Sequence, residues 1–284
     1  MLRRLLNRLE QADALDPAGD RLQETVQSVL RPQRLRDLLH GVWLGHPLHP
    51  ILVQLPVGAF LSTAVLDLLP GQRRAATTLV GVGTAATLPA AVAGLNDWAS
   101  LAREQRRVGL VHAAANTVAL ALYAGSLAAR LRGRQGRGRL LAYCGLAAAG
   151  SGAYLGGHLS YKEGAGVNHA LPDLRRLPDG WHGVADLTAL ADGEPAVRRV
   201  DEVPILLYRT GDEVSAFLER CGHQAGPLGD GDVIGSGRDA CVVCPWHGSV
   251  FKLTDGTVVS GPAATDQPVL RTRVVGGRVE VHLP

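Results

Sequence analysis

The chain has 284 residues, with 29 Lys and Arg against 26 Asp and Glu, so its formal net charge is +3. This length is enough for two domains, and the small basic excess is not interleaved with aromatic residues, so no nucleic-acid partner is expected. Four cysteines are too few for a disulfide scaffold of this length. Residues 51–159 are dominated by Ala, Leu, Gly and Val, whereas residues 175–284 carry frequent charges and turn residues. The composition therefore predicts a membrane part followed by a soluble part.

The N-terminal segment, residues 1–39, is polar and rich in arginine. It opens "MLRRLLNRLEQADALD", in which the paired arginines are not followed by an apolar core. A secretory signal requires such a core, so none is predicted. We expect an amphipathic helix in the cytoplasm or at the membrane surface.

Four apolar segments follow, each close to the roughly 20 residues with which a helix crosses the hydrocarbon core of a bilayer. They cover residues 51–69, 75–95, 108–129 and 140–159. The second and third contain no Asp, Glu, Lys or Arg, and the many small residues suit close helix contacts in lipid. A soluble bundle is the alternative, but its helices should show a charged face. We predict a bundle of four transmembrane helices over residues 40–160, embedded in a lipid bilayer.

The distribution of basic residues does not determine the orientation of this bundle in the membrane. Four crossings place the N-terminus and the C-terminal domain on the same side, and seven basic residues lie near the spans on each side of the membrane. The positive-inside count is therefore balanced. The absent signal and the further N-terminal arginines favour the inner or cell membrane of a bacterium, with the C-terminal domain in the cytoplasm.

Polar residues recur at the ends of the apolar segments that antiparallel crossing brings to the same membrane face. The residues of this predicted face are His46, His49, Asp97, His112, Asn116 and His158. Ionisable groups at membrane depth are costly and therefore candidates for function. Three interpretations stay open: ordinary interfacial residues, ligands of haem b or another metal group, and a quinone site.

The stretches "GHPLHPILVQLPVG", "GLNDW", "VHAAAN" and "GGHLSYKEGAGV" occur in this order. Together they resemble the bacterial predicted membrane proteins of domain of unknown function 2231, over roughly residues 40–170. That family has no assured activity, so the resemblance implies a membrane bundle without naming a reaction. Residues 161–176 contain Gly and Pro and are expected to form a linker that lets the following domain move.

Two short motifs in the polar part combine cysteine with histidine. "CGHQAGPL" begins at Cys221 and "CPWHGSVF" at Cys244, which gives C-x-H followed by C-x-x-H. Two thiolates and two imidazoles are the ligands of an asymmetric [2Fe–2S] cluster, in which the histidines replace two cysteines on one iron. Zinc is the alternative, but zinc fingers usually pair Cys with Cys and His with His along the chain. The predicted ligands are Cys221, His223, Cys244 and His247.

These motifs, with "DGTVVSGPA" and "LRTRVVGGRVEVHLP", resemble the Rieske [2Fe–2S] domain family over residues 177–284. The resemblance implies an all-β antiparallel sandwich with a small cluster-binding subdomain. Two hairpins fit it: "VPILLYRTGDEVSAFL" with a Thr-Gly-Asp turn, and "LRTRVVGGRVEVHL" with a Gly-Gly turn.

Two positions separate this chain from cytochrome bc-type Rieske proteins, which carry an additional disulfide beside the cluster. Gly226 and Trp246 stand where its cysteines would be, so the resemblance is to the lower-potential, ferredoxin-like Rieske proteins of oxygenase systems. Cys241 is expected to be a buried bystander. Four further residues are expected to surround the cluster, namely Gly222, Pro245, Trp246 and Ser249. The Ser249 hydroxyl is expected to bond a cluster sulfur and raise the potential.

The combined prediction is a membrane-anchored electron-transfer protein that serves an unknown redox partner and exchanges electrons with haem or quinone at the histidine face. An oxygenase site would need a mononuclear iron held by two histidines and a carboxylate. Only His282 follows His247, so the chain is expected to lack its own substrate-oxidising iron. Alternatives are a non-catalytic redox sensor and the anchored ferredoxin component of an oxygenase or reductase system.

Overall fold

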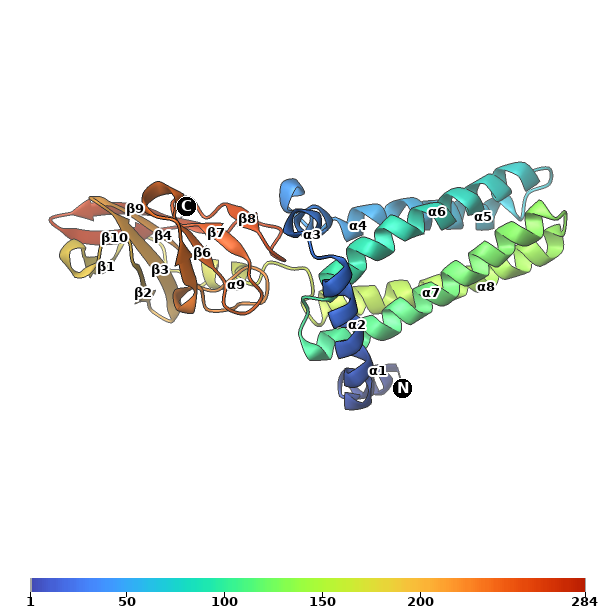
Figure 1. Cartoon of the computed structure of the whole chain (residues 1–284), viewed down its shortest axis with the longest axis horizontal. Helices are drawn as coiled ribbons and strands as arrows, with labels where there is room; N and C mark the ends of the chain where they lie inside the picture. Colours follow the sequence, from blue (N-terminus) through green and yellow to red (C-terminus); the bar gives the residue numbers. More distant parts are fainter. Residues whose placement is uncertain (1, 284) are drawn as a thin grey trace. The chain divides into compact units, whose positions relative to one another are not determined.

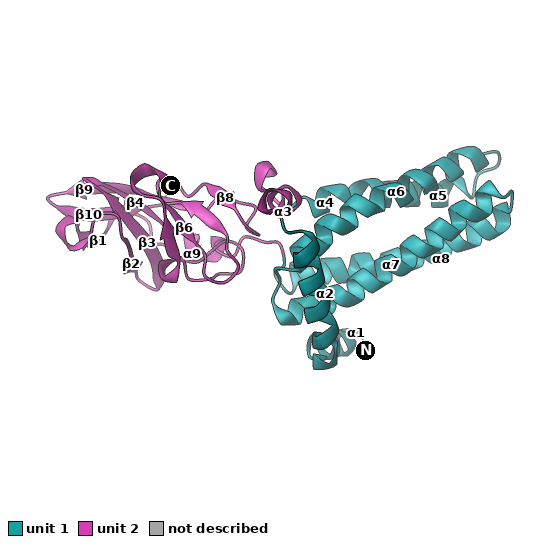
Figure 2. Cartoon of the chain, in the orientation of Figure 1, with its two compact units in different colours: residues 1–31, 47–165 teal, residues 32–46, 166–284 magenta. Residues whose placement is uncertain are grey.

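The computed structural model describes residues 2–283, and the side chains of residues 4–283, in two compact units. The helical unit comprises residues 1–31 and 47–165, and the cluster unit comprises residues 32–46 and 166–284 (Figure 2). This division differs from the expected boundaries, because the segment 32–46 belongs to the unit that holds the cysteine–histidine motifs.

The helical unit is built from long helices joined by short turns (Figure 1). Its helices are α1 (Leu2–Glu10), α2 (Asp16–Val29), α4 (His49–Leu52), α5 (Gln54–Leu66), α6 (Arg73–Trp98), α7 (Arg103–Leu131) and α8 (Gln135–Tyr161), with a 3₁₀ turn at Asp13–Leu15. Helices α7 and α8 lie side by side, and the tight turn between them contains Gly133 at φ +77°. Such a positive φ is readily adopted by glycine, which explains the residue at this turn.

Within residues 2–283, three helical stretches are long and apolar enough to cross a membrane. They are His49–Leu66, Arg73–Trp98 and Arg103–Leu131. The fourth predicted span, residues 140–159, is helical within α8 but is not among them. Its glycines, two tyrosines, Ser151 and His158 lower its apolar character. The prediction of a membrane bundle is thus met by three candidate spans rather than four.

The core of the helical unit combines an aromatic stack with a buried ion pair. The rings of Phe60 and Tyr123 are 3.5 Å apart between centroids and nearly parallel, at 5°. Farther along, the Arg130 Nη1 donates to Asp67 Oδ1 at 2.9 Å. The two side chains are 0% and 2% exposed, so each charge depends on the other for compensation.

The cluster unit contains two antiparallel sheets. The larger has the order β1-β10-β9-β4-β3-β2 and the smaller the order β5-β6-β7-β8. The strands are β1 (His182–Asp186), β2 (Pro195–Val200), β3 (Val203–Thr210), β4 (Glu213–Leu218), β5 (Asp232–Ile234), β6 (Cys241–Val243), β7 (Val250–Lys252), β8 (Val258–Ser260), β9 (Val269–Val275) and β10 (Arg278–His282). The β-rich domain expected from the sequence is therefore confirmed.

Both predicted hairpins form. Strands β3 and β4 pair across the Gly211 turn, and β9 pairs with β10 across Gly276 and Gly277. The last two residues have φ of +58° and +81°. Positive φ at both central residues is the requirement of a type I′ hairpin turn, which explains the Gly-Gly pair.

Short helical segments complete the cluster unit. They are α3 (Gln33–His40) and α9 (Leu171–Leu174), with 3₁₀ turns at Val42–Leu44, Leu187–Ala189, Leu228–Asp230 and Gly237–Asp239. Helix α3 ends at Gly41, whose φ of +78° is a left-handed helix cap. Both α3 and the turn Val42–Leu44 lie against β8. The segment that precedes the first candidate span is therefore folded onto the smaller sheet.

Candidate metal centre

Two loops of similar construction carry the cysteine–histidine motifs. In the first, Cys221 N donates to Gly226 O and Ala225 N donates to Cys221 O, both at 2.8 Å. In the second, Cys244 N donates to Ser249 O at 2.8 Å and Gly248 N donates to Cys244 O at 3.0 Å. In each loop the cysteine's own amide and carbonyl close the turn, which holds the following histidine at a defined place.

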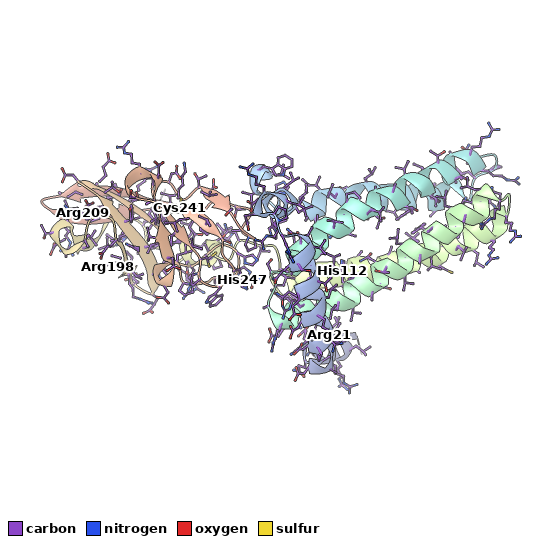
Figure 3. The ribbon with its side chains drawn as sticks, in the orientation of Figure 1. Arg21, His112, Arg198, Arg209, Cys241 and His247 are labelled. Carbon is purple, nitrogen blue, oxygen red and sulfur yellow. The ribbon has the colours of Figure 1, made fainter. Side chains whose placement is uncertain are left out.

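The structure brings the four predicted ligands together. The rings of His223 and His247 are 5.0 Å apart between centroids and nearly perpendicular, at 86°. The thiols of Cys221 and Cys244 lie within hydrogen-bonding reach and are 1% and 3% exposed as residues. The second histidine, His247, is exposed at the surface of the unit (Figure 3), whereas His223 is half-buried. The site thus has a buried sulfur side and an accessible imidazole side.

The electrostatics of the site give one thiol, that of Cys244, and one imidazole, that of His223, the protonation states that metal ligation requires. The hydrogen bond from Cys221 lowers the pKa of the Cys244 thiol to about 6, and the same bond, together with burial, raises the pKa of Cys221. Burial, with His247 as the next cause, lowers the pKa of His223 to about 3. A neutral imidazole beside an easily formed thiolate is what a metal centre binds.

The glycine of the first loop allows the two loops to lie close together. A Cβ on Gly226 would lie 2.9 Å from Cys244 Sγ, so glycine keeps the first loop close to the sulfur of the second. The same Cβ would lie 3.0 Å from Cγ of Trp246. Gly226 and Trp246 therefore face one another across the loops, as two disulfide-forming residues would. With one thiol and one imidazole from each loop, the donor set suits an asymmetric [2Fe–2S] cluster.

The residues expected around the cluster occupy different environments. Ser249 is 0% exposed, and its Oγ accepts a hydrogen bond from Ala263 N at 3.0 Å, which leaves the hydroxyl hydrogen for another acceptor. Trp246 is 57% exposed, and Pro245 is also at the surface. Gly222 is buried in the first loop.

Gln267 is a residue of this site that the sequence patterns did not indicate. It is 2% exposed, and its Oε1 accepts from Gly222 N at 3.1 Å. Its Nε2 donates to Leu218 O and Arg220 O, both at 2.7 Å. One amide side chain thus ties the first loop to the end of β4. A lone Gln in "TDQPVL" has no spacing signal that predicts such a role.

Cys241 lies in β6, outside both loops. It is 9% exposed, and burial raises the pKa of its thiol. Its Sγ contacts Asp239 O at 3.6 Å. This environment agrees with a protonated thiol in the core rather than a ligand.

Five of the six residues of the predicted histidine face belong to the helical unit. In the helical unit, His49 Nδ1 bonds Ala90 O and His112 Nδ1 bonds Gly152 O, both at 2.8 Å. The two imidazoles lie close enough to interact electrostatically, and Asn116 Nδ2 donates to His112 O at 2.9 Å.

Of the other three residues of that face, His158 has partners of its own. His46 belongs to the cluster unit, and Asp97 lies in the last turn of α6. His158 Nε2 bonds Glu10 Oε1 at 2.9 Å and is 3.5 Å from Glu163 Oε1. Of the six predicted residues, His49, His112 and Asn116 therefore form one group.

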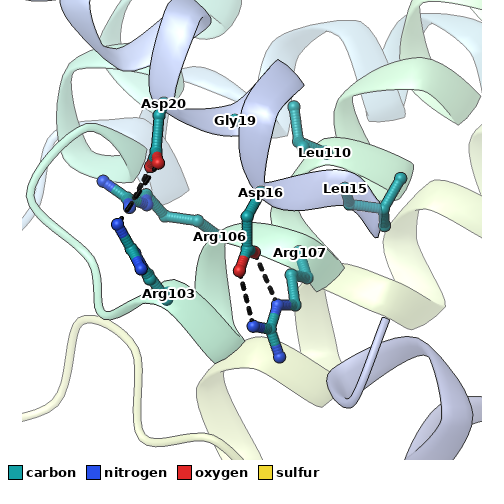
Figure 4. Close-up of a pocket in the computed structure, with 8 residues that line it drawn as sticks. All are labelled: Leu15, Asp16, Gly19, Asp20, Arg103, Arg106, Arg107 and Leu110. Atoms are coloured by element: carbon teal, nitrogen blue, oxygen red, sulfur yellow. Dashed lines mark hydrogen bonds and ion pairs between the residues drawn. The ribbon is translucent and has the colours of Figure 1, made fainter. Parts of the chain in front are cut away.

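Three arginines at the start of α7 form ion pairs with helix α2 (Figure 4). From the sequence they are expected only as basic residues near the end of a span. Arg107 forms a bidentate pair with Asp16, with both N–O distances at 2.7 Å. Arg106 Nη2 donates to Asp20 Oδ1 at 2.8 Å, and Arg103 is 3.3 Å from the same carboxylate. The acidic residues of α2 are thus the partners of the basic cluster.

Comparison with known proteins agrees with both units. Residues 45–169 match the family described as "Predicted membrane protein (DUF2231)", and residues 180–272 match the Rieske [2Fe-2S] domain. With the apolar helices, the first match indicates a membrane protein.

Similar proteins are known for the cluster unit. The anthranilate 1,2-dioxygenase ferredoxin subunit of Burkholderia cepacia is 32% identical over 103 residues, covering 36% of this chain and 92% of that protein. Ferredoxin CarAc of Metapseudomonas resinovorans is 32% identical over 97 residues, covering 33% and 87%. A solved complex of reduced oxygenase and oxidized ferredoxin in carbazole 1,9a-dioxygenase matches with 29% identity over 36% of this chain and 92% of that chain, at a TM-score of 0.32. The chain therefore belongs to the Rieske [2Fe-2S] family through its cluster unit, which follows a membrane domain of the DUF2231 family.

Proposed function

We propose that this protein is a membrane-anchored electron carrier with a Rieske-type [2Fe–2S] cluster. The observation that carries the proposal is the convergence of two thiols and two imidazoles from two matched loops, with His223 and His247 5.0 Å apart. A bound [2Fe–2S] cluster supplies one-electron chemistry at a potential set by its ligands, hydrogen bonds and exposure. The ferredoxin relatives support a carrier role.

The residues of the site would have different roles in such a carrier. Cys221 and Cys244 would hold one iron at the buried side of the site, and His223 and His247 would hold the other. The Ser249 hydroxyl, whose oxygen accepts from Ala263 N, would be able to donate its hydrogen to a cluster sulfur and so raise the potential. His247 is exposed beside Trp246, which is 57% exposed, so these two residues form the surface at which an external redox protein approaches.

The helical unit anchors this carrier in the cell membrane with four spans, α8 being the fourth. Helix α8 has 27 residues and is therefore about 40 Å long, which exceeds the roughly 30 Å hydrocarbon core. It packs beside α7, which is a candidate span. The arginines of the N-terminal segment favour a cytoplasmic cluster unit.

A second electron-carrying site in the helical unit is favoured by one observation. The Nδ1 atoms of His49 and His112 each lie 2.8 Å from a helix carbonyl oxygen, so each Nδ1 carries a hydrogen and donates it. The Nε2 atoms then hold lone pairs, the state in which imidazole ligates a metal or accepts a hydrogen bond. This arrangement supports haem b or a quinone at this pair.

The membrane-carrier proposal is tested on the full chain purified in detergent. We expect two irons per chain and a reversible one-electron visible titration, and the chain should stay in membranes washed with alkaline carbonate. Release by the wash, or an irreversible titration, would contradict it. Turnover with an added reductase and oxygenase would favour the ferredoxin-component alternative. Redox-dependent binding of a partner without turnover would favour the sensor.

The second site has its own test. A Soret band, or extractable quinone, is expected from the wild-type chain and should be lost in His49→Ala and His112→Ala. Their absence from the wild type would exclude a redox group at this pair while leaving the cluster proposal intact.

A further inference from the structure

The segment that leads into the first candidate span is part of the cluster unit. Residues 32–46 fold with residues 166–284, and Val42 packs against the core that contains Cys221 and Cys244. The Rieske family match covers residues 180–272 and does not include this segment. Helix α3 therefore lies outside the matched domain in sequence and packs against β8 of the smaller sheet.

Asp37 of α3 reaches the backbone that supports the second cluster loop. Its Oδ1 accepts a hydrogen bond from Gly261 N at 2.9 Å, across 224 residues of sequence. Gly261 has φ +109°, and a Cβ there would lie 2.4 Å from Ser249 Cα and 2.9 Å from Gly248 O. The Gly261 turn is thus pressed against the loop of Cys244.

The loop continues this chain of contacts to the metal-binding residues. Ser249 O accepts from Cys244 N at 2.8 Å, and Ser249 Oγ accepts from Ala263 N, two residues after Gly261. Displacing the Gly261 turn would therefore move Ala263, which donates to Ser249 Oγ, and disturb the close approach of the turn to Ser249 Cα. Because interiors are close-packed, a shift at this turn is passed on to its neighbours.

The end of α3 approaches the first cluster loop as well. His40, its last residue, is 5% exposed, and Val42, two residues further on, packs against the core that contains Cys221. The segment 32–46 thus contacts both the core behind the first loop and the turn that supports the second loop.

We propose that α3 is an integral wall of the cluster site and that Asp37 is a positioning residue for the second cluster loop. Asp37 accepts the Gly261 N–H and thereby fixes the turn on which the loop of Cys244 and His247 rests. This inference rests on the proposed cluster. The segment 32–46 that contains α3 lies in the sequence between the two parts of the helical unit, residues 1–31 and 47–165.

The test compares Asp37→Ala with Asp37→Asn in the full chain purified in detergent. Asparagine keeps an Oδ1 acceptor, whereas alanine removes it. Glu202→Ala, in the turn before β3, is the matched control because its side chain is 95% exposed. The measurements are the EPR spectrum, the midpoint potential, and the rate at which a chelator bleaches the visible absorption.

We expect Asp37→Ala to shift the EPR spectrum and the potential and to bleach about fivefold faster, the factor corresponding to one net hydrogen bond. Asp37→Asn should stay within about twofold of the wild type, and Glu202→Ala should be unchanged. If Asp37→Ala does not fold, Asp37→Glu takes its place: it keeps the charge but displaces the acceptor, and it should shift the spectrum in the same direction.

The outcomes separate the two proposals. A wild-type chain without a cluster signal would overturn the proposed function itself. A normal wild-type signal that Asp37→Ala, or its Asp37→Glu replacement, leaves unchanged would overturn the role of α3. An Asp37→Asn variant that behaves like Asp37→Ala would overturn positioning through the hydrogen bond.

Discussion

Replacing Gly261 by alanine is the sharpest perturbation of the second cluster loop that leaves every ligand in place. The backbone of Gly261 has φ +109°, outside the regions that other residues readily adopt. A Cβ would also lie 2.4 Å from Ser249 Cα, a backbone atom that cannot rotate away. The substitution therefore combines backbone strain with a steric clash beside the loop of Cys244.

Backbone strain and the steric clash together determine how much free energy of unfolding the substitution is expected to remove. An unfavourable backbone conformation costs about 1–3 kcal/mol, and overpacking a tight site costs a similar amount. Together they reduce the free energy of unfolding by about 2–6 kcal/mol, out of the roughly 5–15 kcal/mol typical of a domain. Gly276→Ala is the matched control, because Gly276 has φ +58° and no atom within 4 Å of its Cβ position. Its expected cost is only about 1–2 kcal/mol.

The assay is urea unfolding of the full chain in detergent, followed by the visible absorption of the cluster and by circular dichroism. Gly261→Ala should lose its visible absorption at clearly lower urea than Gly276→Ala. Equal unfolding midpoints for the two variants would refute the reasoning, because backbone strain alone would then account for both.

Three further predictions concern other parts of the chain. Asp67→Ala leaves the fully buried Arg130 uncompensated and should lower stability in detergent by about 3–5 kcal/mol; a loss below about 1 kcal/mol by thermal unfolding would contradict this. The hydrogen bond from Arg107 lowers the pKa of Asp16, so the packing of α2 on α7 should be full above the usual carboxyl range and weaken as pH falls through the lowered value. Hydrogen exchange of residues 16–29 at acid and neutral pH measures this, and Asp16→Asn should reduce the pH dependence, with Asp20 as the remaining carboxylate of α2 that pairs with α7. The Cys241→Ala variant should retain two irons per chain by iron analysis. Loss of iron from this variant would show that Cys241 takes part in binding the cluster.

Local patterns were enough to predict the parts of the fold that depend on neighbouring residues. The Gly-Gly pair at 276–277 requires positive φ at both positions and so marks the hairpin of β9 and β10. The C-x-H and C-x-x-H spacings mark two loops, because each needs only a short turn to present its thiol and imidazole. The structure places the rings of His223 and His247 5.0 Å apart between centroids, and the role of the four residues as ligands stays a prediction.

Contacts between residues that are far apart in the sequence leave no local sequence pattern from which they can be predicted. The bond between Asp37 and Gly261 joins residues 224 positions apart, and nothing in the residues around Asp37 distinguishes it from a solvated helix position. Arginines near a span look alike whether they face lipid headgroups or, like Arg107, pair with a carboxylate on another helix. The span count depended on α8, whose glycines and tyrosines make it less apolar than the helices around it.

The most direct test of the cluster assignment is low-temperature EPR of the reduced full chain labelled with ¹⁵N-histidine. We predict the signal of a reduced [2Fe–2S] cluster with couplings to two histidine nitrogens, both lost when His223 and His247 are replaced by cysteine. A reduced, iron-loaded chain whose signal shows no nitrogen coupling would contradict the account.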